Sequence, residues 1–211
     1  MSRHKLLQEI IALEWEMFRQ VQNVGGEADC QHDPGTFQIM RESQLATWDE
    51  ELLQSYSEDL REAKNQGRNL LSEKYAWMME ETHPWEFAKL SQSLPQVSEV
   101  SRAQIQEIVD IHLGWQKAMA ERYPCLLSHA RPAEAKGAGV TSLATYLRGE
   151  LLTYSARTIA LYHAKTLAKA AAGENEAREN LANQVKAYGF ASLEDCEAHL
   201  ASKMAKSANR G

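Results

Sequence analysis

Four charged side chains occupy the middle of predicted apolar helix faces, where charged groups are seldom found. Glu14, in the segment 3–23, lies among leucine, isoleucine, methionine and phenylalanine residues that recur at helical spacing. Arg41, Lys74 and Glu150 have the same central position in three later segments. Because burying an unpaired ion costs roughly several kcal/mol, the four side chains are expected to meet one another. The pattern therefore predicts one polar pocket that holds two cations and two carboxylates.

The residue types in this pocket indicate what it could do. The cations are hydrogen-bond donors that would hold an anionic group of a small molecule, and carboxylates and phenols exchange protons. The candidate substrate-binding residues are Arg41, Lys74 and the neighbouring Gln44. The candidate catalytic residues are Glu14, Glu150, Tyr75 and Tyr154. The pattern favours a small enzyme or a ligand-binding protein, but it names neither a reaction nor a substrate.

A structural interpretation of the same charges stays open. Long charged side chains often bury their stems and keep the charged head in water, and a buried ion-pair network can be purely structural. The alternative is therefore a helical protein-interaction module whose function lies on an exposed surface. Arg157 and His112 are also predicted to face the core. Convergence of the charged heads on a solvent-reachable cavity would favour ligand binding, and pairing without a cavity would favour the alternative.

Two further motifs contain residues that could do chemistry. Cys30 precedes a helix start at Asp33-Pro34, where the helix dipole could lower the thiol pKa, so it is a possible nucleophile, although a lone cysteine is more often structural. The motif Glu80-x-x-His83 matches half of a carboxylate-bridged di-iron site. A second such motif is missing from the sequence, so we expect no metal and no cofactor.

The composition is typical of a soluble globular protein. The 211 residues are 44% hydrophobic and 25% charged, and the net charge of -6 argues against nucleic acid as a partner. The three cysteines are scattered without a CxxC pair, which favours a reducing compartment. The first residues lack the pattern of a signal peptide, and no run reaches the roughly 20 apolar residues of a membrane span. A cytoplasmic location follows, whereas the oligomeric state is not indicated.

The segment 141–172 is predicted to be the longest helix, around which the others pack. Thr141 or Ser142 can cap its start, and Gly173 supplies its end. Apolar residues line two sides of this segment, as expected for a helix between neighbours. Gly149 weakens a helix by about 1 kcal/mol relative to alanine, so its presence suggests that another backbone comes close there.

Helical spacing and capping signals predict the remaining elements. The predicted helices cover residues 3–23, 34–45, 48–65, 69–82, 84–92, 101–123, 175–188 and 192–206. Sustained alternation with period two, the signature of a half-buried strand, is missing. The fold class is therefore an all-α, single-domain multi-helix bundle over residues 1–205, followed by a frayed tail at 206–211.

Several long blocks of the sequence are similar to a known family. The blocks ALEWEMFRQVQNVGGEADCQHDPGTFQIMRESQLATWDEELLQSY, GRNLLSEKYAWMMEETHP and TSLATYLRGELLTYSARTIALY resemble a bacterial family, domain of unknown function family 4125, over roughly residues 8–195. Since the activity of that family is unassigned, the resemblance implies no reaction. Its recurrent blocks include Glu14, Cys30, Asp33, Arg41, Gln44, Tyr56, Asp59, Lys74, Tyr75, Glu150 and Tyr154. The resemblance adds Asp59 to the substrate-binding candidates, and His112, where such proteins have glutamine, becomes a weaker catalytic candidate.

Overall fold

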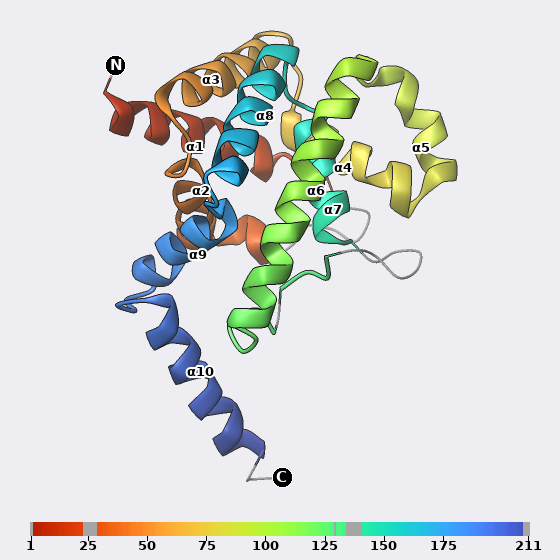
Figure 1. Cartoon of the computed structure of the whole chain (residues 1–211). Coiled ribbons are helices and arrows are strands. Elements are labelled where there is room, and N and C mark those ends of the chain that lie inside the picture. The colour runs from red at the N-terminus through yellow and green to blue at the C-terminus, as the bar shows by residue number, and fades with distance from the viewer. Residues whose placement is uncertain (1, 23–28, 129, 134–140, 209–211) are drawn as a thin grey trace.

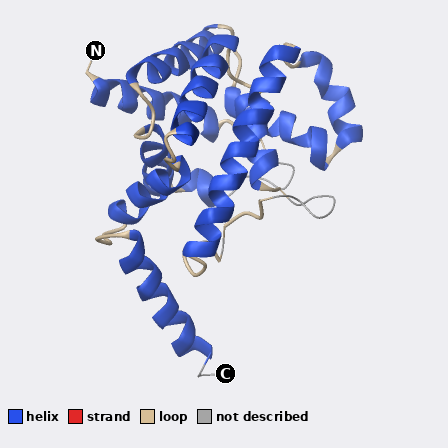
Figure 2. Ribbon diagram, in the orientation of Figure 1, coloured by secondary structure: helices blue, strands red, loops and turns tan. Residues whose placement is uncertain are grey.

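The computed structural model describes residues 2–22, 29–128, 130–133 and 141–208, and every regular element in this part of the chain is a helix (Figures 1 and 2). The all-α prediction is therefore confirmed. The α-helices are α1 (Arg3–Arg19), α2 (Pro34–Leu45), α3 (Glu50–Asn65), α4 (Leu70–Thr82), α5 (Pro84–Leu90), α6 (Glu99–Arg122), α7 (Leu143–Leu151), α8 (Ala156–Ala171), α9 (Glu176–Ala187) and α10 (Leu193–Ala208). Two short 3-10 helices are η1 (Asp29–His32) and η2 (Ser91–Ser93).

Side-chain caps fix the starts of the helices that carry the charged residues. The Asp33 carboxylate accepts from the Thr36 amide at 3.0 Å before α2, and Asn69 caps α4 in the same way. Both side chains satisfy a backbone amide of the first helical turn, which has no partner within the helix. The cap of α3 is Asp49, which accepts from the Leu52 amide, whereas the Thr47 hydroxyl donates to the Gln44 carbonyl at the end of α2. The helix therefore begins at Glu50, two residues later than predicted.

The predicted long helix 141–172 is wrong as a single element, because the chain breaks between α7 and α8. The Thr153 hydroxyl donates to the Glu150 carbonyl, and the Ser155 side chain caps the new helix by accepting from the Thr158 amide. Such side chains compete with the helical hydrogen bonds of the backbone. The Asp59 carboxylate, from α3, accepts from the Ser155 amide at 3.0 Å and holds the break in place.

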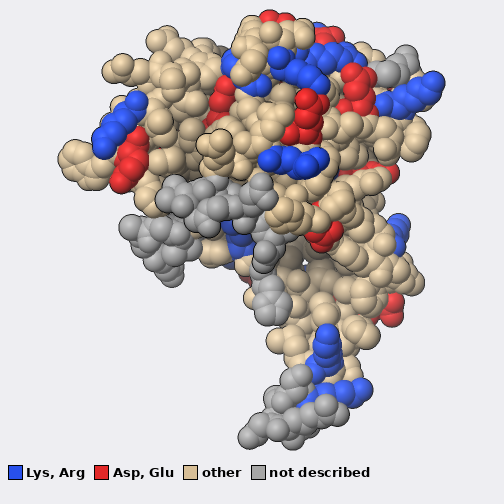
Figure 3. Space-filling model, turned by 180° about the vertical axis from the view of Figure 1, so that it is seen from behind, with Lys and Arg blue, Asp and Glu red and all other residues tan. Residues whose placement is uncertain are grey.

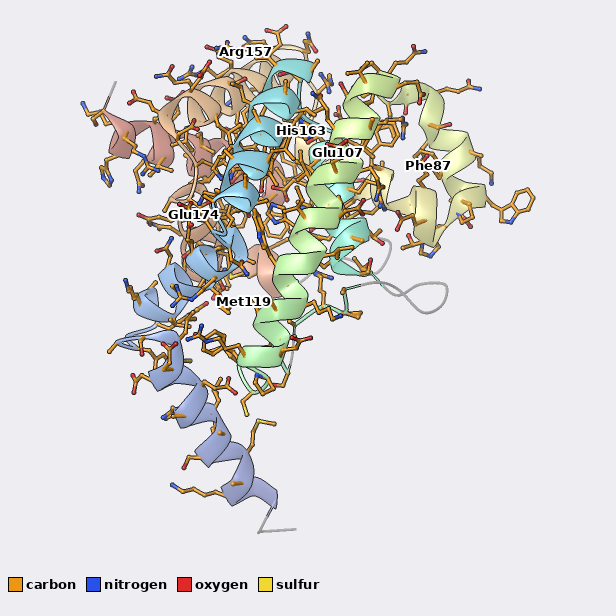
Figure 4. All side chains as sticks on the ribbon, viewed as in Figure 1. Phe87, Glu107, Met119, Arg157, His163 and Glu174 are labelled. Carbon is orange, nitrogen blue, oxygen red and sulfur yellow. The ribbon has the colours of Figure 1, made fainter. Side chains whose placement is uncertain are left out.

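The break also corrects the prediction for Arg157. Helical spacing counted through residues 152–155 places this side chain in the core, but the new register of α8 turns it outward. Arg157 lies at the outer end of α8 and pairs with Glu58, and its side chain is 58% exposed (Figure 4). A pair this exposed contributes little to stability.

Helix α7 packs directly on α4, and Gly149 allows the close approach. A Cβ atom at Gly149 would lie 2.6 Å from Met78 Cγ and 3.0 Å from the Lys74 carbonyl oxygen. Both contacts are shorter than packed carbon and oxygen atoms tolerate. The predicted close backbone is therefore confirmed, and it places the residue after Gly149 opposite Lys74.

Two hydrophobic clusters stabilise the described part of the fold. The larger one joins α1, α3, α4, α6, α7 and α8 and includes Trp48, Tyr56, Tyr154 and Tyr162. The smaller one joins the end of α6 to α9 and α10 through Met119, Tyr123, Val185, Leu193 and Cys196. Helix α10 leaves the body and points away from it (Figure 1). It continues to Ala208, so part of the predicted frayed tail is helical, and residues 209–211 lie outside the described part.

The surface and the helix lengths bear on possible partners. On the face seen in Figure 3, lysine and arginine side chains are intermixed with aspartate and glutamate. None of the described helices is both long enough and apolar enough to cross a membrane.

Candidate functional site

The four predicted core charges form one connected network at the meeting point of α1, α2, α4 and α7. Arg41 binds Glu14 with two N–H groups, Nη2 to Oε1 at 2.5 Å and Nε to Oε2 at 2.7 Å. Arg41 Nη1 also donates to Glu150 Oε1 at 3.1 Å, and Lys74 Nζ donates to Glu150 Oε2 at 2.6 Å. The chain of contacts is therefore Glu14–Arg41–Glu150–Lys74. The bidentate pair is the strongest geometry available to arginine and carboxylate.

Polar neighbours complete the hydrogen bonding of the two carboxylates. The Tyr56 hydroxyl donates to Glu14 at 2.6 Å, and the Tyr154 hydroxyl donates to Glu150 at 3.0 Å. Gln44 Oε1 accepts from Arg41 Nη1 at 2.8 Å. Tyr56 was not among the predicted site residues. Its place on the apolar face of residues 48–65 could have indicated it, since a buried phenol needs a hydrogen-bond partner.

The network is buried, and each charged group in it has an oppositely charged partner. Glu14 is 0%, Lys74 3% and Glu150 5% exposed, so each charge depends on its partners. Burial acts to raise the pKa of Glu150, but Lys74 and Arg41 outweigh it and hold that pKa far below its usual value. Burial acts to lower the pKa of Lys74, but Glu150 outweighs it and raises that pKa. The network thus combines two cations with at least one firmly ionised carboxylate.

A cavity of about 390 Å³ lies beside the network. Gln44 and Glu150 line it, so the polar network contributes directly to its wall. Much of the remaining wall is apolar and comes from Met40, Met119, Leu127, Ala130, Leu143, Leu147, Ala177 and Leu181. The amides of Gln116, Asn180 and Gln184 add neutral donors and acceptors. This size and this mixture of apolar and polar groups are typical of small-molecule sites.

Arg131 brings a cation to the same cavity from the loop before α7. Its guanidinium lies 4.8 Å from the centre of the Tyr146 ring, and Lys74 Nζ lies 3.4 Å from the centre of that ring. The carbonyls of Pro132 and Ala133 accept from the first amides of α7, which fixes this stretch of the loop. Among the described lining residues, Arg131 is the only lysine or arginine.

A second buried polar cluster forms the cavity wall near α6, α8 and α9. The Tyr162 hydroxyl lies 3.2 Å from His112 Nε2 and donates to Glu176 Oε1 at 3.2 Å. Lys165 pairs with the other Glu176 oxygen. Burial lowers the pKa of His112 to about 4, against the influence of Glu176, which raises it. His112 is a weak candidate from the sequence, and Tyr162, Glu176 and Lys165 are not among the predicted site residues.

The other predicted site residues lie away from this cavity, or their side chains lie outside the described part of the structure. Asp59 holds the start of α8 and borders a different cavity of about 320 Å³, together with Arg68 and Tyr154. Burial raises the pKa of Asp59, and the Ser155 amide opposes that shift. Tyr75 is half-buried on α4 and is not among the described lining residues. Cys30 belongs to η1, but its side chain lies outside the described part of the structure.

Glu80 and His83 have other partners. Glu80 pairs with Arg102 at 3.9 Å, and the His83 ring contacts the Thr82 hydroxyl at 2.9 Å. Within the residues that the structure describes, no group of three or more His, Cys, Asp or Glu side chains is placed to hold a metal ion.

Comparison with known proteins agrees with the resemblance seen in the sequence. A family model described as "Protein of unknown function (DUF4125)" matches residues 4–198. Neither the curated proteins nor the solved structures include a match to the chain.

Proposed function

The chain belongs to the DUF4125 family of proteins of unknown function, and we propose that it binds a small amphipathic anion in the 390 Å³ cavity. The observation that carries the proposal is that a buried charge network and an apolar wall border the same cavity. Gln44 and Glu150 bring the network to the cavity wall, and apolar side chains of α2, α6, α7, α9 and the loop after α6 supply much of the remaining wall.

The charge balance of the wall favours an anion over a cation. Glu150 is compensated by Lys74 and Arg41, and Glu176 is compensated by Lys165. Arg131 has no such carboxylate among the described contacts and only stacks on Tyr146. An acid group of the ligand beside Arg131 would neutralise the positive charge of this guanidinium. The guanidinium can donate two parallel hydrogen bonds to such a group.

In this proposal the predicted cations have a positioning role. Arg41 and Lys74 direct their donors at Glu14 and Glu150, and neither is among the described lining residues. They hold Glu150, and with it α7, in place as one side of the cavity. Glu150 itself is a weak base, because Lys74 and Arg41 hold its pKa far below the usual carboxyl value.

Three probe molecules with carbon chains of equal length test whether the cavity prefers an anion. Octanoate, octylammonium and 1-octanol differ in charge but present the same apolar body, so their dissociation constants isolate the charge preference. We expect octanoate to bind most tightly, and Arg131→Gln to reduce its affinity to that of 1-octanol. Arg61→Gln is the control, since this exposed arginine pairs with Glu9 away from the cavity. Octylammonium binding as tightly as octanoate would refute the anion preference, and binding of none of the probes would favour the interaction-module alternative.

A further inference from the structure

The His112 ring contacts the Tyr162 hydroxyl through one nitrogen and borders the cavity. Nε2 lies 3.2 Å from that hydroxyl, which also lies 3.2 Å from Glu176 Oε1. Trp115, one turn along α6, packs against the edge of the ring with centroids 4.8 Å apart. The ring is therefore held between a hydrogen bond and an aromatic contact.

Counting hydrogens fixes the tautomer of this ring. The Tyr162 hydroxyl has one hydrogen, and an ionised carboxylate can only accept. Because Glu176 is paired with Lys165, the hydroxyl hydrogen goes to Glu176. The contact with His112 is then a hydrogen bond only if Nε2 carries the hydrogen and the tyrosine oxygen accepts it. A neutral ring with its hydrogen on Nε2 has a lone pair on Nδ1.

The other ring nitrogen, Nδ1, has no hydrogen-bond partner among the described residues. His112 is one of the side chains that line the cavity. Burial keeps the ring neutral at pH 7, since the pKa of His112 is lowered to about 4. The charged groups near the ring are Glu176, which raises that pKa, and Lys165 and Lys169, which lower it.

We infer that His112 Nδ1 is a fixed hydrogen-bond acceptor of the cavity and that the natural ligand presents a hydroxyl or N–H group to it. This inference rests on the proposed function for the presence of a ligand. It narrows the ligand class from an amphipathic anion to one that also carries a neutral donor. Glutamine at this position would keep a donor for Tyr162 but would place no acceptor at the position of Nδ1.

Nitrogen NMR of the histidine rings tests the tautomer directly. In ¹⁵N-labelled protein at pH 7, we expect His112 Nδ1 to show the shift of an unprotonated ring nitrogen and Nε2 that of a protonated one. Addition of 8-hydroxyoctanoate or 1,8-octanediol should move the Nδ1 signal, whereas octanoate should leave it nearly in place. A proton found on Nδ1, or an Nδ1 signal that no hydroxylated probe moves, would overturn the inference.

Two variants separate the acceptor function of His112 Nδ1 from the hydrogen bond between Nε2 and the Tyr162 hydroxyl. In His112→Gln the amide N–H can replace Nε2, and in His112→Asn the amide oxygen can replace Nδ1. We expect wild type and His112→Asn to bind 8-hydroxyoctanoate roughly three- to tenfold more tightly than octanoate, as for one added hydrogen bond. His112→Gln should bind the two acids equally, and a preference that persists in this variant would contradict the inference. The proposed function fails separately if 8-hydroxyoctanoate binds no more tightly than 1,8-octanediol.

Discussion

Lys74 and Glu150 lie 76 residues apart in the chain, and their side chains meet at 2.6 Å beside Gly149. The absence of a side chain at Gly149 lets α7 approach the backbone of α4 at Lys74. The same contact point therefore sets the helix packing, the ion pair and the position of Glu150 in the cavity wall. Packing and electrostatics therefore depend on each other at this contact.

Replacing Gly149 by alanine should destabilise the protein by about 1–3 kcal/mol, because the new methyl group would overlap Met78 and the Lys74 carbonyl. Gly114→Ala is the matched control, since a Cβ there meets nothing within 4 Å in a helix of the same chain. That control should gain up to about 1 kcal/mol from the higher helix propensity of alanine. Urea denaturation measures both changes, and a stabilised Gly149→Ala would show that α7 and α4 do not pack as described.

Replacing Glu14 by glutamine should cost on the order of 3–5 kcal/mol, because Arg41 would lose the partner that receives two of its hydrogen bonds. Glu16→Gln on the same helix should change the melting temperature little, since Glu16 and its partner Lys64 are each 50% exposed. Thermal unfolding of the two variants gives the comparison. Equal melting temperatures would mean that the Glu14 carboxylate is solvated.

His112 should make the fold less stable in mild acid. Its pKa falls from 6.5 to about 4 on folding, so between these values the unfolded chain binds a proton that the folded chain does not. Stability then rises with pH in this window and is independent of His112 above it. The loss from pH 7 to pH 5 should be about 2 kcal/mol, as the shift implies.

Denaturation of His112→Asn at both pH values checks this assignment. The variant should lose less stability than the wild type between pH 7 and pH 5, whereas His4→Gln, at an exposed position of α1, should behave as the wild type does. An unchanged pH dependence in His112→Asn would assign the acid sensitivity to other groups. Glu150 adds acid sensitivity only at lower pH, because its stabilising effect is complete above the usual carboxyl pKa and is lost as the pH falls below that value.

The sequence was sufficient to predict the charge network but not the whole cavity. Glu14 and Arg41 were predictable because a charge at the centre of an apolar face must have a buried partner. The mistaken position of Arg157 came from counting helical spacing through a break held partly by Asp59, a residue far away in the chain. The cluster around Tyr162 was missed because its members come together only when α6, α8 and α9 pack.

A crystal structure of the protein with 8-bromooctanoate tests ligand binding most directly, because anomalous scattering locates the bromine independently of the protein atoms. We expect a carboxylate within hydrogen-bond distance of Arg131 and a bromine among the apolar side chains of the cavity, near Met119, Leu127 or Leu181. A bromine bound only elsewhere, or a reversed ligand with its carboxylate away from Arg131, would contradict it.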